Sequence, residues 1–364
     1  MRVLIVNHHV LDLQGGSETQ CHEIASRLVK LGHTVTYGVC RPGRQTYDVS
    51  YPTYPLRGSL PTAFKAALTE LKPDIVYWRR NKRYLLRCVL AAHRRGVKFV
   101  YAVSSISDVE IITRRHFDES ASLFRRAGRA LAAVAAATKD PANYFAISLT
   151  DGVVFQHSGQ IPRRFRGRYE VIYNAYPQRD VPTTPSATPY VLWVGNVKKR
   201  KNPEYFLRLA ADLQHPGVEF WMVGDIHETS YQSVLADTSS LPSGFRYLGY
   251  QSQAAVDSLM KGSLFVVSTS SMDEGFPNVF IHAWLQRKGV VSLYFDPGAL
   301  LVTEKIGLCS GDYVTFKNDV SRLIAEADLR GSMGERAFRF ARAHCDPETN
   351  VKQLEAFLAR VMAS

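Results

Sequence analysis

The feature that most constrains this chain is an alternation of short apolar runs with helical patterns along both halves. The apolar run 3–6 leads into a Gly-rich turn, and Cys21, Ile24 and Leu28 then recur at helical spacing until Gly32. A second strand pattern follows at 34–37. Strands joined through a helix pair in parallel, because a tight hairpin cannot connect parallel neighbours. The alternation predicts an α/β fold with parallel sheets.

The length of 364 residues suits two domains. Further strands are predicted at 74–78, 98–103, 151–155 and 170–173, with a helix at 85–94. A Pro-rich stretch then interrupts the pattern, and the second half repeats it, with strands at 190–194, 218–223, 245–248, 263–268 and 290–294 and helices at 203–213, 254–260 and 277–287. We predict one domain over 1–176, a linker over 177–189, a second domain over 190–346, and a final helix over 347–364 that packs back toward the first domain.

Composition narrows the class of protein. No run approaches the roughly 20 apolar residues of a membrane span. The five cysteines are scattered and form no Cys-x-x-Cys pair, so the sequence predicts neither a disulfide framework nor a zinc site and favours a cytoplasmic location. The formal net charge of +12 indicates an anionic partner, or else a basic but solvated surface. No nucleic-acid-binding module is recognisable.

The turn that starts at Glu274 carries the clearest chemical pattern. It places a carboxylate before a Gly and a Pro at the start of the helix predicted over 277–287. The N-terminal end of a helix presents N–H groups and a positive dipole, which suits a diphosphate. Glu274 would then lie where it can hold sugar hydroxyls. An ordinary capping turn explains the pattern about equally well, since acidic residues favour helix starts.

Two other turns point the same way. The segment 194–203 places four cations, among them Lys198 and Lys201, between a strand and a helix, where they could neutralise the charge on a departing phosphate. Its alternative reading is a solvated basic loop. Gly15 and Gly16 open the first predicted helix and let the backbone approach a ligand, although they form no Gly-x-Gly-x-x-Gly fingerprint and a plain βα turn also uses such glycines.

Taken in order, these motifs resemble the retaining glycosyltransferases of family four. They are Gly-Gly-Ser-Glu from Gly15, Val-Ile-Tyr-Asn from Val171, Val-Gly-Asn…Lys-Asn-Pro-Glu from Val194 and Glu-Gly-Phe-Pro-Asn-Val from Glu274. The resemblance covers nearly the whole chain. It implies the GT-B fold, in which two Rossmann-like doubly wound domains face an interdomain cleft. It also implies transfer of a sugar from a UDP- or GDP-type donor to a glycan or lipid-linked glycan, in surface polysaccharide or glycoconjugate synthesis.

The resemblance assigns roles residue by residue. Glu274 matches the first acid of the family's Glu-x7-Glu pattern, which is expected to contact the transferred sugar, and Lys201 matches the phosphate-binding lysine. The resemblance implies that both are catalytic residues. The donor-binding set comprises Gly15, Gly16, Asn196, Lys198, Gly224, Tyr250, Gln251, Gly275, Phe276, Pro277, Asn278, Val279 and His282. The sequence departs from the family at His282, which replaces an acid that holds ribose hydroxyls, and at Asn196, which replaces an arginine. A non-catalytic nucleotide-sugar-binding protein is therefore one alternative, and a nucleotide-sugar epimerase is another.

No Asp-x-Asp occurs, so we expect a metal-independent enzyme without a cofactor other than its nucleotide-sugar co-substrate. On the acceptor side, Arg79 and Arg80 follow a predicted strand end. Arg125 and Arg126 belong to a basic segment with an apolar face that suits an anionic membrane, which predicts peripheral attachment at the inner face of the membrane. An ordinary amphipathic surface helix fits that segment equally well.

Overall fold

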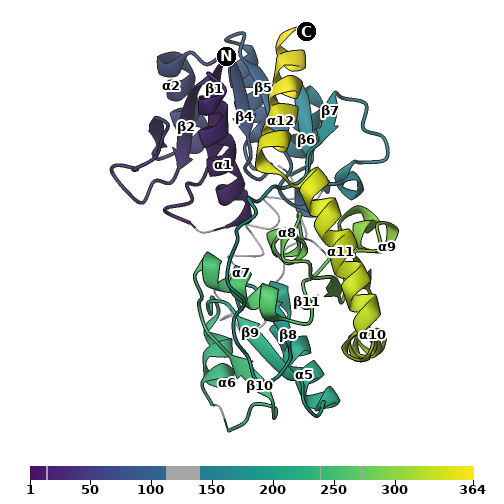
Figure 1. Cartoon of the computed structure of the whole chain (residues 1–364). Helices are drawn as coiled ribbons and strands as arrows, with labels where there is room; N and C mark the ends of the chain where they lie inside the picture. The colour runs from purple at the N-terminus through teal and green to yellow at the C-terminus, as the bar shows by residue number, and fades with distance from the viewer. Residues whose placement is uncertain (14, 112–139, 238, 273) are drawn as a thin grey trace. The chain divides into compact units, whose positions relative to one another are not determined.

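The computed structural model describes residues 1–13, 15–111, 140–237, 239–272 and 274–364. It divides the chain into two compact units. Unit 1 comprises Met1–Asn174 and Pro347–Ser364, and unit 2 comprises Ala175–Asp346 (Figure 1). Each unit is built on its own parallel sheet, so the predicted pair of parallel-sheet Rossmann-like domains is confirmed. No helix among these residues is long and apolar enough to cross a bilayer.

Unit 1 contains a seven-stranded parallel sheet in the order β3-β2-β1-β4-β5-β6-β7. Its strands are β1 (Arg2–Asn7), β2 (Thr34–Cys40), β3 (Thr53–Leu56), β4 (Ile75–Trp78), β5 (Lys98–Ala102), β6 (Gly152–Phe155) and β7 (Tyr169–Val171). Its helices are α1 (Gly16–Lys30), α2 (Leu60–Leu71), α3 (Leu85–His93) and α12 (Pro347–Met362), with short 3-10 turns η1 (Ile106–Val109), η2 (Ala146–Leu149) and η3 (Ser158–Gln160).

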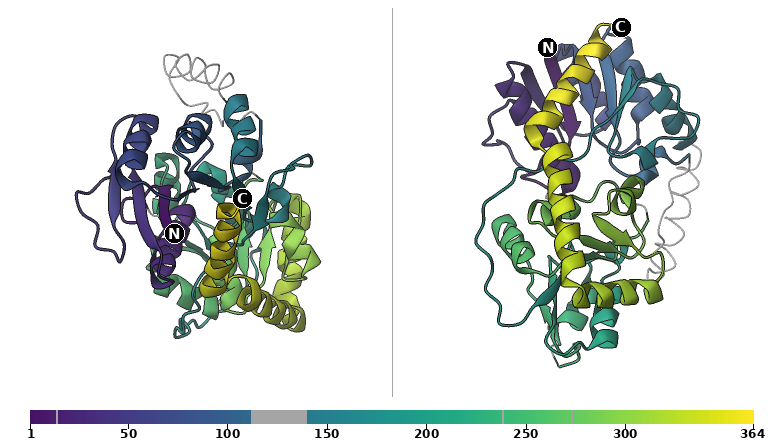
Figure 2. Two further views of the ribbon diagram at one scale, coloured as in Figure 1. Left: turned by 90° about the horizontal axis from the view of Figure 1, so that it is seen from above. Right: turned by 45° about the vertical axis from the view of Figure 1, so that its right-hand side comes forward.

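The sheet of unit 1 is buried on both faces, which is why its strands are apolar without alternation. Successive side chains of a strand point to opposite faces, so Leu4 and Val6 of β1 join the core beneath α2 and α3, while Val3 and Ile5 join the core beneath α1 and α12. Figure 2 shows α12 beside α1, and the two helices pack on each other.

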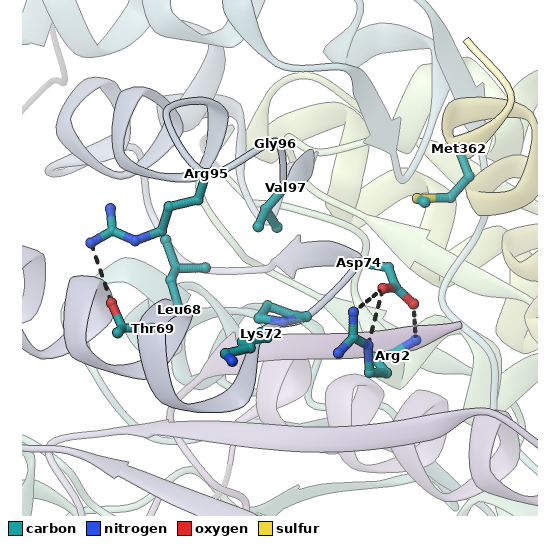
Figure 3. Close-up of a pocket in the computed structure, with 10 residues that line it drawn as sticks. Arg2, Leu68, Thr69, Lys72, Asp74, Arg95, Gly96, Val97 and Met362 are labelled. Carbon is teal, nitrogen blue, oxygen red and sulfur yellow. Dashed lines mark hydrogen bonds and ion pairs between the residues drawn. The ribbon is translucent and has the colours of Figure 1, made fainter.

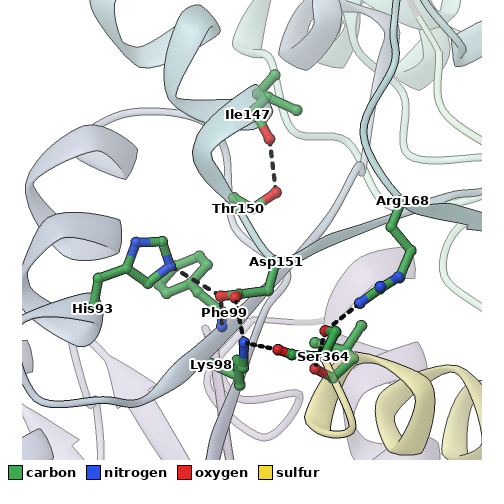
Figure 4. Close-up of polar contacts among 9 residues, drawn as sticks. His93, Lys98, Phe99, Ile147, Thr150, Asp151, Arg168 and Ser364 are labelled. Carbon is green, nitrogen blue, oxygen red and sulfur yellow. Dashed lines mark hydrogen bonds and ion pairs between the residues drawn. The ribbon is translucent and has the colours of Figure 1, made fainter.

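A polar cluster ties α12 to the start of β5 and β6 (Figure 4). The Asp151 carboxylate accepts hydrogen bonds from the Phe99 amide at 2.8 Å and from the Lys98 ammonium at 3.1 Å, and His93 Nε2 lies 2.9 Å away. Lys98 also donates to the carbonyl of Ser364, at 3.4 Å. Asp151 therefore joins α3 and β5 through one half-buried carboxylate, and Lys98 extends the cluster to Ser364, just beyond α12.

Unit 2 contains a six-stranded parallel sheet in the order β10-β9-β8-β11-β12-β13. Its strands are β8 (Tyr190–Val194), β9 (Glu219–Val223), β10 (Phe245–Tyr247), β11 (Val266–Ser268), β12 (Val290–Ser292) and β13 (Gly307–Cys309). Its helices are α5 (Pro203–Leu213), α6 (Gln232–Ala236), α7 (Gln253–Gly262), α8 (Asn278–Leu285), α9 (Leu300–Thr303), α10 (Tyr313–Ala325) and α11 (Ala327–His344), with 3-10 turns η4 (Lys199–Lys201), η5 (Thr229–Tyr231) and η6 (Pro297–Ala299).

The Pro-rich stretch before β8 lies along α7. Lys261 Nζ donates to the carbonyl of Val181 at 2.6 Å, and the Ser258 hydroxyl donates to the carbonyl of Pro182 at 2.6 Å. The Thr184 hydroxyl donates to the Ser258 hydroxyl at 3.0 Å. These contacts give the extended residues hydrogen-bond partners that a prolyl segment cannot supply for itself.

Several elements differ from the sequence prediction. The strand predicted at 263–268 begins at Val266, and the helix predicted at 277–287 is α8, Asn278–Leu285. The sequence prediction missed β3, α2 and β13. β3 contains Pro55, which a strand tolerates at the edge of a sheet, and β3 is an edge strand. A proline inside a short apolar run weakens the sequence signal for a strand.

Candidate functional site

The strand order reverses in unit 2 between β8 and β11, and in an open α/β sheet ligands bind beyond the carboxyl ends of the strands at such a point. The loop after β8 carries Lys198 and Lys201, and the loop after β11 carries Glu274. Two motifs that are more than seventy residues apart in the sequence are therefore brought together by adjacent parallel strands.

The centre of this arrangement is an ion pair between Lys201 and Glu274. Lys201 Nζ lies 2.8 Å from Glu274 Oε1 and 3.2 Å from the hydroxyl oxygen of Ser270. The two side chains keep only 19% and 15% of their surface exposed. At this depth an ion pair is strong only if its geometry is held, because both charges have lost most of their hydration.

The two loops hold that geometry by backbone contacts. The Thr269 hydroxyl donates to the carbonyl of Lys201 at 2.6 Å, and Asn202 Nδ2 donates to the carbonyl of Thr269 at 3.0 Å. The Ser271 amide donates to the carbonyl of Arg200 at 3.1 Å. Trp193 Nε1, from β8, adds a bond to the Thr269 hydroxyl at 2.9 Å. The loops after β8 and β11 thus behave as one rigid support for the ion pair.

The electrostatics of the pair favour an ionised carboxylate. Burial, the largest influence, raises the pKa of Glu274, but Lys201, Arg200 and Lys198 together lower that pKa below its ordinary value. Burial and the neighbouring Lys201 lower the pKa of Lys198. The site is therefore a cluster of three cations around one carboxylate, with cationic charge in excess, and it favours an anionic ligand.

The helix α8 begins four residues after Glu274. Gly275, Phe276 and Pro277 form a buried turn, and the amide of Phe280 donates to the carbonyl of Pro277 at 3.0 Å. Phe276 packs against Trp284, with ring centroids 6.1 Å apart. Asn278 and Val279 in the first helical turn are half-buried. The first N–H groups of a helix have no partner inside it, so this end of α8 adds a positive dipole beside the cations.

Other predicted donor-site residues lie on neighbouring loops of unit 2. Gly224 follows β9 with φ of +147°, and a Cβ atom there would collide with the carbonyl oxygen of Gly195. Asn196 is half-buried in the loop after β8. Gln251 Nε2 bonds the carbonyl of Leu248 at 2.8 Å, and Tyr250 is 63% exposed. Gly224 is thus required by the close approach of two loops, whether or not a ligand is near.

His282 lies on α8 and is 6% exposed. Its Nδ1 lies 3.0 Å from Asp257 Oδ1 on α7, and its ring lies 3.7 Å from that of Tyr176, centroid to centroid. Arg179 Nη1 is 3.7 Å from the other oxygen of Asp257. The sequence analysis did not single out Asp257, Tyr176 or Arg179. No spacing signal links them to His282, because they come from a different helix and from the stretch before β8.

In unit 1 the strand order reverses between β1 and β4, and predicted residues again follow both strands. Gly15 is the N-cap of α1 and adjoins the Glu18 carboxylate, whose pKa is raised mainly by burial. Arg79 is 4% exposed and donates to Asn174 Oδ1 at 2.5 Å, while Arg80 Nη1 lies 2.8 Å from His8 Nε2. Gly16 opens α1.

Two predicted residues, Arg125 and Arg126, lie outside the residues that the structure describes. Among the described residues no group of three or more His, Cys, Asp or Glu side chains is arranged to hold a metal ion. A groove of about 480 Å³ in unit 1 is lined by Arg2, Lys72, Asp74 and Arg95 (Figure 3). Arg2 and Asp74 lie at the amino ends of β1 and β4, the edge opposite the one where the predicted residues gather.

Comparison with known proteins identifies a family that part of the chain matches. Residues 177–340 match the family model described as Glycosyl transferases group 1. The chain is 30% identical over 161 residues to the lipopolysaccharide core biosynthesis glycosyltransferase LpsE of Rhizobium meliloti (strain 1021); this alignment covers 42% of the chain and 44% of LpsE. The chain therefore aligns with less than half the length of that curated relative.

Solved structures resemble the whole chain. Sucrose-phosphate synthase from Thermosynechococcus elongatus superposes with a TM-score of 0.76 at 16% identity, covering 100% of this chain and 99% of that one. Anabaena HepE, solved in complex with UDP and glucose, superposes with a TM-score of 0.71 at 18% identity, covering 99% and 100%. The fold is that of the GT-B glycosyltransferases. Within it, unit 2 contains a glycosyl transferases group 1 domain.

Proposed function

We propose that this protein is a glycosyltransferase that moves a sugar from a nucleotide-sugar donor to a glycan or lipid-linked glycan acceptor. The donor is of the UDP or GDP type. The enzyme belongs to family four, retains the anomeric configuration, needs no metal ion and acts in surface polysaccharide or glycoconjugate synthesis. The observation that carries the proposal is the Lys201–Glu274 pair at the switch point of unit 2, within a domain that matches Glycosyl transferases group 1.

The chemistry follows from the charges at this site. When the bond between the sugar and the diphosphate breaks, negative charge grows on the leaving phosphate oxygen. Lys201, Lys198 and the N-terminal end of α8 provide fixed positive charge that stabilises it without a metal ion. Glu274 stays ionised and accepts hydrogen bonds from sugar hydroxyls. The acceptor hydroxyl then attacks the anomeric carbon of the sugar from the face that the diphosphate leaves, and its proton passes to the leaving phosphate oxygen.

Two relatives support the class of substrate. The curated relative LpsE acts in lipopolysaccharide core biosynthesis, and HepE was solved with UDP and with UDP-glucose. The same donor type and a glycan acceptor are the natural assignment for a chain with this fold and this cluster of cations.

The first test replaces Lys201 with Met. The protein is incubated with UDP- and GDP-sugars, and release of the free nucleotide diphosphate is measured. We expect the Lys201→Met variant to lose at least a hundredfold in turnover, the usual loss when one preorganised charge partner is removed. Lys317→Met, on α10 of the same unit, is the matched control and keeps full turnover. Equal turnover of Lys201→Met and wild type would contradict the phosphate role.

Two further measurements address the finer claims. Turnover in excess EDTA remains unchanged if no metal ion takes part. Proton NMR of the first-formed product shows the same anomeric configuration as the donor if transfer is retaining. Binding of UDP or GDP to wild type without any turnover on glycan acceptors would instead favour the non-catalytic reading that His282 suggests.

We also propose that unit 1 binds peripherally to the inner face of an anionic membrane. Unit 1 contains 28 Lys and Arg against 15 Asp and Glu, a formal net charge of +13, whereas unit 2 contains 17 against 18, a net charge of −1. The neighbouring elements α3 and η2 pack on each other and bear the exposed apolar residues Leu90, Phe145 and Leu149. Exposed apolar side chains with surrounding positive charge suit an anionic lipid surface.

Flotation with phosphatidylcholine vesicles, with and without phosphatidylglycerol, tests this attachment. Wild type is expected to float only with the anionic vesicles, and the variant Phe145→Ser/Leu149→Ser is expected to stay at the bottom. Val314→Ser, which removes an equally exposed apolar residue from unit 2, should float like wild type. Flotation of the double variant to the same extent as wild type would contradict the role of this surface.

A further inference from the structure

The loop between β1 and α1 contains a fully buried imidazole, His9, whose hydrogen bonds fix its proton. Its Nδ1 lies 3.2 Å from the Leu11 amide, which can only donate, so Nδ1 is an acceptor. Burial, followed by the nearby His22, lowers the pKa of His9 to about 4, so at pH 7 the ring is neutral and its proton lies on Nε2. Tyr47 and Tyr37 pack against the ring, with centroids 4.5 and 5.1 Å away, and keep it in this orientation.

Tyr51 extends this arrangement to α1. It comes from the loop between β2 and β3, is 4% exposed, and places its hydroxyl oxygen 3.1 Å from His9 Nε2 and 2.7 Å from His22 Nδ1. Burial raises the pKa of Tyr51, so the hydroxyl keeps its proton. Because His9 Nε2 donates to the oxygen, the Tyr51 proton has His22 Nδ1 as its acceptor among the described residues. The bond therefore requires that Nδ1 of His22 has no proton.

Three hydrogen bonds thus run in one direction, from the Leu11 amide to His9, from His9 to Tyr51 and from Tyr51 to His22. A proton taken from water by Nδ1 of His22 makes that nitrogen a donor, and the Tyr51 hydroxyl must then donate elsewhere. His9 Nε2 can accept it only if the proton of His9 moves to Nδ1, where it opposes the Leu11 amide. One donor loses its partner in either arrangement, which costs free energy when the donor is buried.

Exposure decides which donor is released. The Tyr51 hydroxyl lies on a residue that is 4% exposed and cannot turn to water, whereas Leu11 is 40% exposed and its amide can be hydrated. The turn that contains Leu11 keeps its other bonds, since the amides of Asp12 and Leu13 both donate to the carbonyl of His9 at 3.0 Å. Protonation of His22 therefore loosens this turn at Leu11 without unfolding it.

The other charged and titratable groups around His22 and Tyr51 have partners of their own. They come from both loops, from β2, from α1 and from α12, which packs on α1. They are Asp12 with Arg44 and Tyr47, Tyr37 with the carbonyl of His8, Cys21 with Asn7, Glu23 with Arg27, and His33 with Glu355 of α12.

We propose that His22 is a positioning residue that makes the loop between β1 and α1 sensitive to pH: neutral His22 holds the Leu11 amide through Tyr51 and His9, and protonated His22 releases it. His22 is half-buried, so it exchanges protons with water while His9 stays neutral. The loop leads to Gly16, which opens α1. A consequence for turnover rests on the proposed function, in which this glycine turn approaches the donor.

The direction of the bonds can be measured without a ligand. Nitrogen-15 NMR of the full chain at pH 8 distinguishes a protonated Nδ1 from a protonated Nε2, and His9→Gln and His22→Asn identify the signals of the two rings. We expect Nε2–H in both His9 and His22. A protonated Nδ1 in either ring at pH 8 would overturn the inference.

The release of Leu11 is tested by hydrogen exchange of its amide at pH 8 and pH 5, expressed relative to an unstructured peptide at the same pH. Wild type is expected to lose about tenfold in protection at pH 5, the effect of one hydrogen bond. In His22→Asn the side-chain oxygen can accept from Tyr51 at both pH values, so protection should not change. His33→Gln removes another half-buried imidazole of unit 1 and is the matched control, which should respond to pH like wild type.

Thermal unfolding of each variant at both pH values checks that the fold is kept. Unchanged protection of Leu11 in wild type, or a loss of the same size in His22→Asn, would overturn the role of His22.

Turnover from pH 8 to pH 5 tests the link with the reaction. We expect wild type to lose a larger factor than His22→Asn, and equal losses would overturn control of turnover by this loop. Wild type without turnover at any pH would contradict the proposed function, and the exchange of Leu11 would then decide by itself whether His22 controls the loop.

Discussion

Replacing Gly224 with Ala should destabilise unit 2 more than any other single added methyl group in the loops around the candidate site. Gly224 follows β9 with φ of +147°, a region that residues with a side chain essentially do not enter. Its amide donates to the carbonyl of Gly249 at 2.9 Å, and its carbonyl accepts from the Tyr247 hydroxyl at 2.8 Å. These bonds prevent the backbone from turning to relieve the strain.

Two costs add in this variant. The strained backbone costs about 1–3 kcal/mol. The new Cβ atom would collide with the carbonyl oxygen of Gly195, and displacing packed backbone costs a further 1–3 kcal/mol or so. We therefore expect unit 2 to lose about 4 kcal/mol of its free energy of unfolding. Gly195 begins the loop that carries Lys201, so the ion pair with Glu274 is also disturbed.

Urea unfolding followed by tryptophan fluorescence measures this loss. Unit 2 contains Trp193, Trp221 and Trp284, whereas unit 1 contains Trp78. Gly249→Ala is the control, because its φ of +63° carries backbone strain but its Cβ would meet no atom within 4 Å, which predicts a loss of only about 1–2 kcal/mol. If Gly224→Ala is no less stable than Gly249→Ala, the close approach of the two loops is not what requires glycine.

Two other changes have clear expected results. Asp151→Ala leaves the Phe99 amide without its partner and should cost about 2 kcal/mol at pH 7. Burial raises the pKa of Asp151, but the hydrogen bonds from Phe99, His93 and Lys98 lower that pKa overall. The stability that Asp151 contributes is therefore present above the ordinary carboxyl pKa and is lost as pH falls below about 4. If the difference in stability between wild type and Asp151→Ala grows below pH 4, this explanation is wrong. Ser252→Ala removes the N-cap of α7 and should lower stability by about 1 kcal/mol, measured by urea unfolding, whereas Ser252→Asp should restore it.

The candidate site was predictable where one short segment contains its own signal. Glu274 with the following Gly and Pro marks a strand-to-helix turn, and the structure has that turn before α8. The cations of 198–201 lie between β8 and α5. Both segments could be predicted because each follows an apolar run. The contacts of each segment could not be predicted, because parallel strands bring together residues that are far apart in the sequence.

His282 shows the limit most clearly. The sequence identifies an imidazole where the family resemblance predicts an acid, and nothing nearby in the chain explains it. Only the packing of α7 on α8 brings the Asp257 carboxylate to its Nδ1. Arg79 is a second case. It follows a predicted strand end and so was assigned to acceptor or membrane binding, but the structure buries it against Asn174, where its exposed surface is 4%.

The sequence by itself therefore determined the class of fold, the two parallel-sheet domains and the motifs that bear charge. Apolar periodicity, glycine and proline act within a few residues, and they report on local structure. The tertiary structure alone decided which charges meet and which ones lose water. Those properties depend on distances across strands and between helices, which local pattern does not fix.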